Sequence, residues 1–271
     1  MAQKSHIAII GAGNIGASIA NGLVTSDHYL PENIILTRRR TYLLENMKQK
    51  GFVVTADNKE AVRKSEIVII AVEPQQIDGV LNEIRSEFLV EAHVLISVVT
   101  GVSIKQIIQQ IGKKVAVIRA MPNTAIAVRE SITCLASNGL GSENGEIVES
   151  IFSTVGKTLW INEEEMVAAT ALGACGIAFF MRAIRAASQG GIEIGFDSKL
   201  ALAIAAQTAK GAASLLLSTG NHPEEEIDKV TTPRGSTISG LNQMENEGFS
   251  SALIKGIKVS AEKAAKLYSK D

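Results

Sequence analysis

One short stretch near the N-terminus limits the fold more than any other part of the chain. Residues 6–16 read His-Ile-Ala-Ile-Ile-Gly-Ala-Gly-Asn-Ile-Gly, a β-branched run that ends in G-x-G-x-x-G. Gly11 permits a tight turn, Gly13 lets the backbone approach a pyrophosphate, and Gly16 lets the next helix pack close to the strand. The stretch predicts a dinucleotide at the helix N-terminus. The alternative is a glycine-rich turn that binds nothing. The predicted binding residues here are Ile10, Gly11, Gly13, Asn14, Ile15 and Gly16.

Apolar runs alternate with helical spacing through the first half of the chain. They lie at residues 34–36, 52–54, 67–70, 94–98 and 115–118. Continuous apolar strands are typical of a parallel sheet with helices on both faces. The pattern therefore predicts an α/β fold with an N-terminal doubly wound (Rossmann) sheet. We expect two further edge strands, at 132–136 and 158–161, flanking a helix at about 143–153.

The end of the second predicted strand indicates which dinucleotide binds. NAD-selective sheets usually carry an Asp or Glu at this point for the ribose hydroxyls, whereas an Arg suits a 2′-phosphate. Here Thr37 is followed by three arginines, and a guanidinium can pair with a phosphate bidentately. We predict NADP, with NADPH preferred over NADH, and place Thr37, Arg38 and Arg39 near the phosphate. The alternative is a helix start whose arginines face solvent.

Ligands of doubly wound sheets lie beyond the carboxyl ends of the strands. The loops at 71–75, 97–101 and 119–124 should therefore line the cofactor cleft, with Asn123 at the nicotinamide end.

Composition changes after residue 161, where strand patterns stop. Asn162 and three glutamates form a capping-box-like helix start. We divide the chain into an NADP-binding Rossmann domain, 1–161, and an all-α domain for substrate binding and dimerisation, 162–271. Pattern alone leaves open a dimer of interleaved helical domains or a monomeric bundle. Helices are expected at 163–190, 198–219, 223–230, 236–247 and 250–268.

A second chemical stretch lies at 230–241. A Pro-Arg-Gly turn leads into Ser236 and Thr237 at a helix start, where backbone N–H groups and hydroxyls converge. That arrangement suits an anion such as a carboxylate. The alternative is ordinary helix capping by Ser or Thr.

Charge and cysteine content exclude several kinds of partner. The net charge is −1, and the only basic cluster is at 38–40, so nothing indicates nucleic acid or a membrane surface. Cys134 and Cys175 match no metal spacing, so no metal site is predicted and a reducing compartment fits. The first strand leaves no room for a signal peptide, and the uncharged run 166–181 is short for a bilayer. We expect a cytoplasmic protein.

The chain resembles the pyrroline-5-carboxylate reductase family over essentially its whole length. The most diagnostic of the matching segments is 230–241, which in the family normally contains Ser-Pro-Gly-Gly-(Thr or Ala)-Thr-Ile. The resemblance implies NAD(P)H-dependent reduction of (S)-1-pyrroline-5-carboxylate to L-proline, the final step of proline biosynthesis. It also implies a homodimer with a shared active site, often within a pentamer of dimers. The matching segments are 10–16, 71–75, 119–124, 189–195 and 230–241.

Individual roles follow from the resemblance. Asn58 would lie by the adenosine ribose or its phosphate, and Ala71, Val72, Pro74 and Asn123 by the nicotinamide half. Thr237 would hydrogen-bond the ring nitrogen of the substrate and is the predicted catalytic residue. The substrate carboxylate would be held by Thr232, Gly235, Ser236 and Thr237.

The chain departs from the family pattern at three places. Glu73 stands where Lys is usual, Arg234 replaces the first glycine of the Gly-Gly pair, and Ser-Gly-Ser-Gly-Pro-Ala-Tyr becomes Gly-Ala-Cys-Gly-Ile-Ala-Phe at 173–179. These changes leave open two alternatives: a related imine or 2-keto acid reductase, and a non-catalytic NADP-binding regulator.

The absence of a general acid favours an imine substrate. Reduction of a ketone needs a proton donor, normally Lys or His. Related hydroxyacid dehydrogenases carry a Lys on the helix that opens the second domain, but residues 166–187 contain neither Lys nor His. The first basic residue, Arg182, does not release its proton. An imine can be protonated before hydride arrives.

Overall fold

The computed structural model describes residues 5–139 and 142–267. The chain forms two compact units. The sheet unit comprises Met1–Cys175 and Ser260–Asp271, and the helical unit comprises Gly176–Val259.

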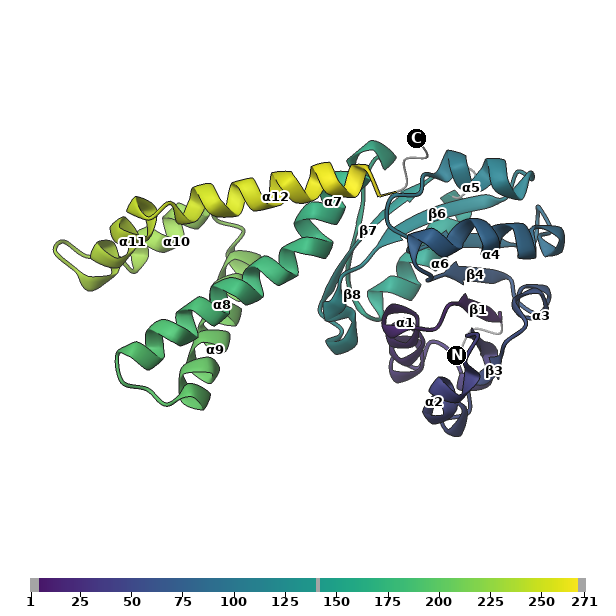
Figure 1. Cartoon of the computed structure of the whole chain (residues 1–271), viewed down its shortest axis with the longest axis horizontal. Helices are drawn as coiled ribbons and strands as arrows, with labels where there is room; N and C mark the ends of the chain where they lie inside the picture. The colour runs from purple at the N-terminus through teal and green to yellow at the C-terminus, as the bar shows by residue number, and fades with distance from the viewer. Residues whose placement is uncertain (1–4, 140–141, 268–271) are drawn as a thin grey trace. The chain divides into compact units, whose positions relative to one another are not determined.

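An eight-stranded sheet forms the centre of the sheet unit (Figure 1), with strand order β3-β2-β1-β4-β5-β6-β7-β8. The first six strands in chain order pair in parallel, so the predicted Rossmann sheet is confirmed. β7 runs antiparallel to β6, and β8 pairs with β7 in parallel. The strands are β1 (Ile7–Ile10), β2 (Ile34–Thr37), β3 (Val53–Thr55), β4 (Ile67–Ile70), β5 (Val94–Ser97), β6 (Ala116–Met121), β7 (Ser131–Ser137) and β8 (Gly156–Trp160).

One expectation about the sheet edge was wrong. Residues 132–136 and 158–161 were both expected to be edge strands, but β7 lies inside the sheet, between β6 and β8. β7 has neighbours on both sides because Ile118–Met121 of β6 pairs with it in antiparallel register. Only β8 forms an edge at this end.

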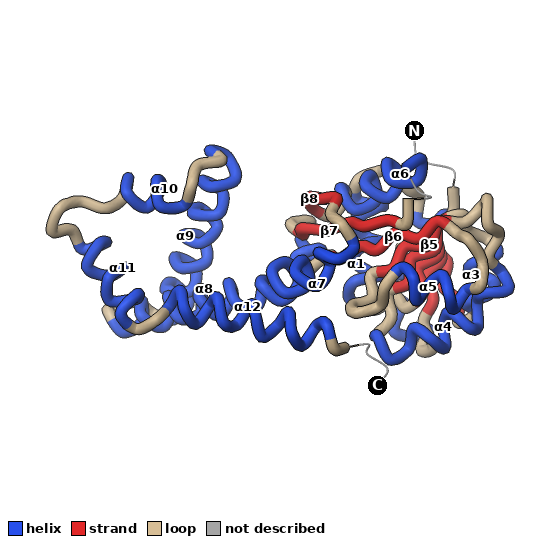
Figure 2. Tube along the Cα trace, turned by 90° about the horizontal axis from the view of Figure 1, so that it is seen from above, coloured by secondary structure: helices blue, strands red, loops and turns tan. Residues whose placement is uncertain are grey.

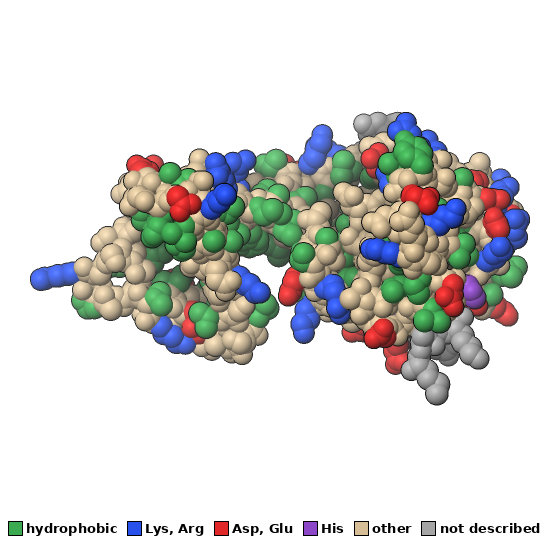
Figure 3. Space-filling model, turned by 90° about the horizontal axis from the view of Figure 1, so that it is seen from below, with side chains coloured by type: hydrophobic (Ala, Val, Ile, Leu, Met, Phe, Trp, Pro, Cys, Tyr) green, Lys and Arg blue, Asp and Glu red, His purple; other side chains and the backbone are tan. Residues whose placement is uncertain are grey.

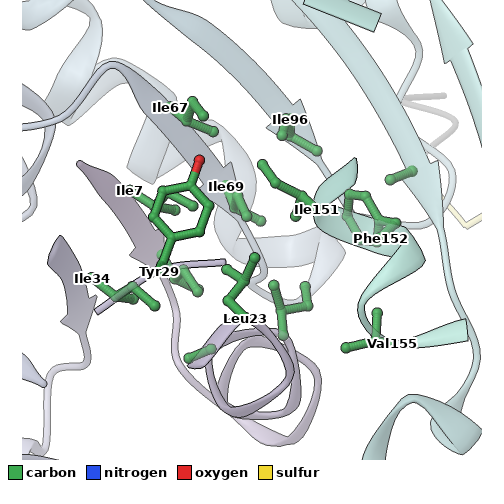
Figure 4. Close-up of a cluster of buried hydrophobic side chains, with 14 of the residues drawn as sticks. Ile7, Leu23, Tyr29, Ile34, Ile67, Ile69, Ile96, Ile151, Phe152 and Val155 are labelled. Atoms are coloured by element: carbon green, nitrogen blue, oxygen red, sulfur yellow. The ribbon is translucent and has the colours of Figure 1, made fainter. Parts of the chain in front are cut away.

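Helices cover both faces of the sheet (Figure 2) and produce two separate cores. Ile7 and Ile9 of β1 point to one face, whereas Ala8 and Ile10 point to the other, as the strand period of two requires. Figure 4 shows the first core, where Leu23 and other buried side chains meet between the sheet and its covering helices. Helices α1 (Asn14–Thr25), α2 (Glu45–Gln49) and α6 (Ser142–Ser153) contribute to the first core, and α3 (Asn58–Arg63), α4 (Ile77–Ile84) and α5 (Ile104–Ile111) to the second.

A buried ion pair ties three elements of the sheet unit together. The side chain of Arg119, in β6, is 8% exposed, and its Nη1 lies 3.3 Å from Glu163 Oε1. The same carboxylate oxygen accepts the backbone N–H of Ile104, at the start of α5, at 2.6 Å. Burial lowers the pKa of Arg119, and the Glu163 carboxylate opposes that change. One carboxylate therefore joins β6, α5 and the beginning of the helical segment.

The segment expected as one α-helix over 163–190 is instead a series of helix types. It begins with a 3₁₀ turn, Glu163–Glu165, capped by Asn162 as predicted. α7 (Met166–Ala169) follows, then the π-helix η7 (Thr170–Cys175), then α8 (Gly176–Glu193). The Asn123 Nδ2 donates to the Gly173 carbonyl at 3.2 Å, so a loop of the sheet unit bonds directly to the π-helix.

The helical unit has almost no core of its own. It lies wholly within the described part of the chain, and only Gly176, Ser188 and Ala201 in it are buried. α8 and α9 approach closely where Gly191 meets Ala201, since a Cβ on Gly191 would lie 3.2 Å from the Ala201 Cβ. Besides α8, the helices are α9 (Ser198–Thr219), α10 (Pro223–Lys229), α11 (Ser236–Asn246) and α12 (Phe249–Ala265), the last of which continues into the sheet unit. The predicted helix end at residue 268 lies outside the described residues.

Large apolar side chains are exposed along these helices. Leu217 is 87% exposed and Ile194 79% exposed. Figure 3 shows hydrophobic side chains clustered on one face of the molecule over this unit. Two helical segments, Glu163–Glu193 and Ser198–Thr219, are long and apolar enough to cross a membrane by length and composition, which is weak evidence by itself. Exposed apolar area of this extent indicates a partner surface.

Candidate functional site

The glycine-rich turn has the geometry that pyrophosphate binding requires. Gly11 has φ +87°, and a Cβ there would lie 2.9 Å from the Ala71 carbonyl oxygen. A Cβ on Gly16 would lie 2.9 Å from Ile9 Cγ2, so α1 packs directly on β1. At Gly13 a Cβ would meet nothing within 4 Å, which leaves the backbone open to a ligand. The three glycines therefore supply a turn, an open approach and a close packing contact.

The first turn of α1 is free to bind an anion. Its N-cap is Gly13, which provides no side-chain cap. The N–H groups of Asn14, Ile15 and Gly16 are at helix positions that have no intrahelical acceptor. Together with the positive end of the helix dipole, these groups can hold phosphate oxygens.

The predicted ribose residues meet at the carboxyl end of β2. Thr37 is buried, and its Oγ1 donates to Asn58 Oδ1 at 2.6 Å. The Thr37 carbonyl accepts the N–H groups of Gly11 and Ala12 at 3.2 and 2.9 Å, which links β2 to the glycine turn. Across the described chain, the side chains of Arg38, Arg39 and Arg40 form no hydrogen bond or salt bridge. The guanidinium groups of Arg38 and Arg39, the two predicted phosphate ligands, are therefore not occupied by a protein partner.

The predicted nicotinamide residues are on two neighbouring loops. Ala71 follows β4, and its N–H donates to the Ile10 carbonyl at 2.8 Å, so the 71–74 loop lies against the glycine turn. Asn123 caps the 3₁₀ turn η5 (Thr124–Val128) through its Oδ1, which accepts the Ala125 N–H at 3.0 Å. Because its Nδ2 also bonds to Gly173, Asn123 organises protein structure as well as being a cofactor candidate.

The predicted substrate residues lie together in the helical unit. Gly235 N–H donates to the Thr232 carbonyl at 2.9 Å and closes a turn around Pro233 and Arg234. A Cβ on Gly235 would lie 2.5 Å from Thr232 Oγ1, so only glycine fits. The N-cap of α11 is Gly235, with no side-chain cap, and Ser236 and Thr237 follow inside the helix. The alternative of ordinary capping by Ser or Thr is therefore wrong, and both hydroxyls stay exposed.

Arg234 adopts a backbone conformation that favours glycine. Its φ is +60°, in the left-handed region. Pro233 precedes it in the turn, and the third position of such Pro-containing turns prefers glycine when φ is positive. The departure from the family's Gly-Gly pair thus places a side chain at a strained position.

A cavity of about 300 Å³ in the sheet unit is lined by Thr100 and Arg119, from two of the loops predicted to line the cofactor cleft, and by Glu163 and Thr170. None of the individually predicted cofactor or substrate residues contributes to its wall. Among the described residues, no three His, Cys, Asp or Glu side chains gather as metal ligands. Burial raises the pKa of the Cys134 thiol, which disfavours a reactive thiolate.

Sequence reasoning missed two acidic residues that organise the site. Glu83 accepts a hydrogen bond from Asn58 Nδ2 at 3.1 Å, and Glu163 neutralises Arg119. The sequence contained a signal for the Arg119–Glu163 pair, because Arg119 is a charge inside an otherwise apolar strand. No local pattern marks Glu83.

Two family descriptions match the chain. Residues 163–267 match "Pyrroline-5-carboxylate reductase dimerisation", and residues 6–101 match "NADP oxidoreductase coenzyme F420-dependent".

Individual relatives give the same result. The chain is 51% identical to pyrroline-5-carboxylate reductase 1 and 47% identical to reductase 2 of Dictyostelium discoideum, covering 97% of this chain in each case. It spans 50% of the length of the first protein and 93% of the second. The solved pyrroline-5-carboxylate reductase of Coxiella burnetii superposes with a TM-score of 0.91 at 28% identity, over 99% of this chain and 100% of that one.

We expect Gly13→Ala to weaken cofactor binding and Gly16→Ala to lower the stability of the fold. Alanine at 13 meets no protein atom, so thermal stability without cofactor should be unchanged, while dinucleotide affinity falls by at least about tenfold because the methyl group blocks the pyrophosphate. Alanine at 16 should destabilise the fold by about 1–3 kcal/mol through overpacking against Ile9. Thermal unfolding and cofactor titration measure both. Unimpaired binding by Gly13→Ala would contradict the proposed approach of the pyrophosphate.

Arg234→Gly should raise the free energy of unfolding by about 0.5–1 kcal/mol, because glycine adopts positive φ without steric cost. Arg234→Ala is the matched control, since it removes the long side chain but keeps the strained backbone. It should give no gain. Thermal midpoints at one fixed protein concentration compare the variants, and equal gains for both would assign the effect to the side chain instead.

Proposed function

The chain belongs to the pyrroline-5-carboxylate reductase family, and from this premise we propose how its residues divide the work of reducing the cyclic imine with NADPH. The family, the fold class and the reaction predicted from the sequence are confirmed by the comparisons: the protein is an NAD(P)-dependent reductase of (S)-1-pyrroline-5-carboxylate. The site assignments below are proposals. The observation that carries them is the uncapped start of α11, which presents free N–H groups and two hydroxyls beside a glycine.

The sheet unit holds the cofactor in this proposal. The N–H groups of α1 bind the pyrophosphate of the glycine turn, and the open space at Gly13 fits that group. The 71–74 loop and Asn123 flank the nicotinamide half. When bound, NADPH supplies the hydride.

The 2′-phosphate is held at the end of β2. Thr37 and Asn58 lie within hydrogen-bond distance of each other there, and Arg38 and Arg39 have no protein partner within the described ranges. Two guanidinium groups that pair with no carboxylate of the described chain favour a phosphate over a ribose hydroxyl at this strand end. NADPH is therefore the preferred reductant.

The start of α11 holds the substrate. The N–H groups at Ser236 and Thr237 bind the substrate carboxylate, together with Thr232 and Gly235. The Thr237 hydroxyl bonds the ring nitrogen, which carries a proton before hydride arrives. No Lys or His is needed as an acid, so the enzyme acts mainly by orienting the reactants.

The helical unit explains why the enzyme is a homo-oligomer. Its family match is to a dimerisation domain, and its apolar helix faces have no core to cover them within one chain. We propose residues 162–271 as the substrate-binding and dimerisation domain, residues 1–161 as the NADP-binding domain, and a pentamer of dimers as the assembly. A soluble, cytoplasmic enzyme accords with this use of the apolar helices.

Purified enzyme should consume reduced nicotinamide only when the imine is present. We expect kcat/KM for NADPH to exceed that for NADH by at least about tenfold, because the arginines bind the 2′-phosphate. Arg38→Ala should reduce this ratio, and Arg40→Ala serves as the matched control. Loss of reduced-nicotinamide absorbance provides the assay. Cofactor binding without imine-dependent oxidation would overturn the substrate assignment.

Thr237→Ala should lower kcat/KM for the imine by about ten- to a hundredfold, since a hydrogen bond to the charged nitrogen is lost. Thr237→Ser keeps the hydroxyl and should retain most activity. Both variants should unfold at the wild-type temperature because the side chain is exposed. Equal rates for Thr237→Ala and the wild type would remove this residue from the mechanism.

A further inference from the structure

A series of hydrogen bonds leads from the glycine turn to Glu83, an acidic residue on α4. The Gly11 N–H approaches Thr37 Oγ1 at 3.4 Å, and Thr37 Oγ1 donates to Asn58 Oδ1 at 2.6 Å. Asn58 Nδ2 then donates to Glu83 Oε2 at 3.1 Å. The four groups come from the turn after β1, the end of β2, the first residue of α3 and the last turn of α4.

Two members of this hydrogen-bond series have a fixed direction: the Gly11 N–H only donates and the Glu83 carboxylate only accepts, and of the two only Glu83 contacts Asn58. A threonine hydroxyl can both donate and accept, and an asparagine amide has one end of each kind. A carboxylate only accepts. Glu83 therefore requires the nitrogen of Asn58 to face it and the oxygen to face Thr37. Without Glu83 the amide could turn over, because the Thr37 hydroxyl would accept from Nδ2 equally well.

We propose that Glu83 is a positioning residue for cofactor selectivity: it orients the Asn58 amide so that a donor, not an acceptor, faces the 2′-substituent of the adenosine ribose. The amide nitrogen carries two hydrogens and gives only one to Glu83, so the second remains for a ligand oxygen. This inference rests on the proposed function, which places the ribose at the end of β2.

If the Asn58 amide were turned over, it would disfavour binding of the phosphate. Its carbonyl oxygen would face phosphate oxygens, and two acceptors cannot share a hydrogen bond. Glu83 also carries a negative charge, which by itself disfavours a phosphate. That repulsion is weak because Glu83 is exposed and solvent screens the charge. Removal of Glu83 would weaken phosphate binding through the turned amide and strengthen it through the lost negative charge. We expect the effect of the amide orientation to dominate.

The test compares Glu83→Ala with Glu87→Gln in the full-length enzyme. Glu87 is the matched control: it is also acidic, but it pairs with Arg63 and Ser86 and does not contact Asn58. We expect Glu83→Ala to raise the KM for NADPH by about tenfold with kcat nearly unchanged, to affect NADH less, and to weaken binding of adenosine 2′-monophosphate equally. Glu83→Gln, which can still accept, should show about a threefold effect. Glu87→Gln should change neither value.

A double variant separates positioning from a general loss of structure. If Glu83 acts through Asn58, then Glu83→Ala should add nothing in an Asn58→Ala background. Additive effects, or an NADPH KM that stays constant or falls in Glu83→Ala, would overturn the proposal.

Two results distinguish the role of Glu83 from the function of the enzyme. Imine-dependent NADPH oxidation by the wild type together with wild-type behaviour of Glu83→Ala would leave the function in place and remove the role of Glu83. A wild-type enzyme that binds neither NADPH nor adenosine 2′-monophosphate would overturn both.

Discussion

The arrangement of the cofactor half depends on the contact of Gly11 with the ends of two neighbouring strands. Its N–H group and that of Ala12 bond to the last residue of β2, and there is no space for a side chain in front of the Ala71 carbonyl. The parallel register of β1 with β2 and β4 brings their carboxyl ends to a common edge, and the positive φ of Gly11 allows the tight turn there. The predicted pyrophosphate turn, the Thr37–Asn58 pair and the 71–74 loop therefore meet at this edge.

The helical unit differs from the sheet unit in having almost no core of its own. The sheet unit has two cores of its own, whereas the helical unit buries only three residues and exposes its large apolar side chains. Burial of apolar area is the main favourable term in folding, so such a unit gains its stability from association. Folding of the helices and formation of the homo-oligomer are for this reason linked, and the predicted substrate residues at the start of α11 belong to the part of the chain that depends on association.

Local patterns explain which parts of the structure could be predicted. The central strands are continuous apolar runs, and α9 begins and ends where sequence indicates, after Asp197 and before Gly220. The glycine turn could also be predicted, because its chemistry lies within six residues. Long-range contacts could not be predicted. The position of β7 depends on its pairing with β6, the π-helix bonds to Asn123 fifty residues away, and the Asn58–Glu83 bond joins two separate helices. Periodicity contains no information about such pairs.

The ion pair between β6 and the start of the helical segment limits how this protein can diverge. Loss of one partner from a fully buried pair costs about 3–5 kcal/mol, and the cost is smaller here because the Glu163 side chain is 29% exposed. Replacement of Glu163 alone would leave Arg119 as a buried charge without an acidic partner and would also free the Ile104 N–H group. A change at one of the two positions alone therefore lowers the stability of the sheet unit. Descendants of this sequence should inherit residues 119 and 163 as a unit, although 44 positions separate them in the chain.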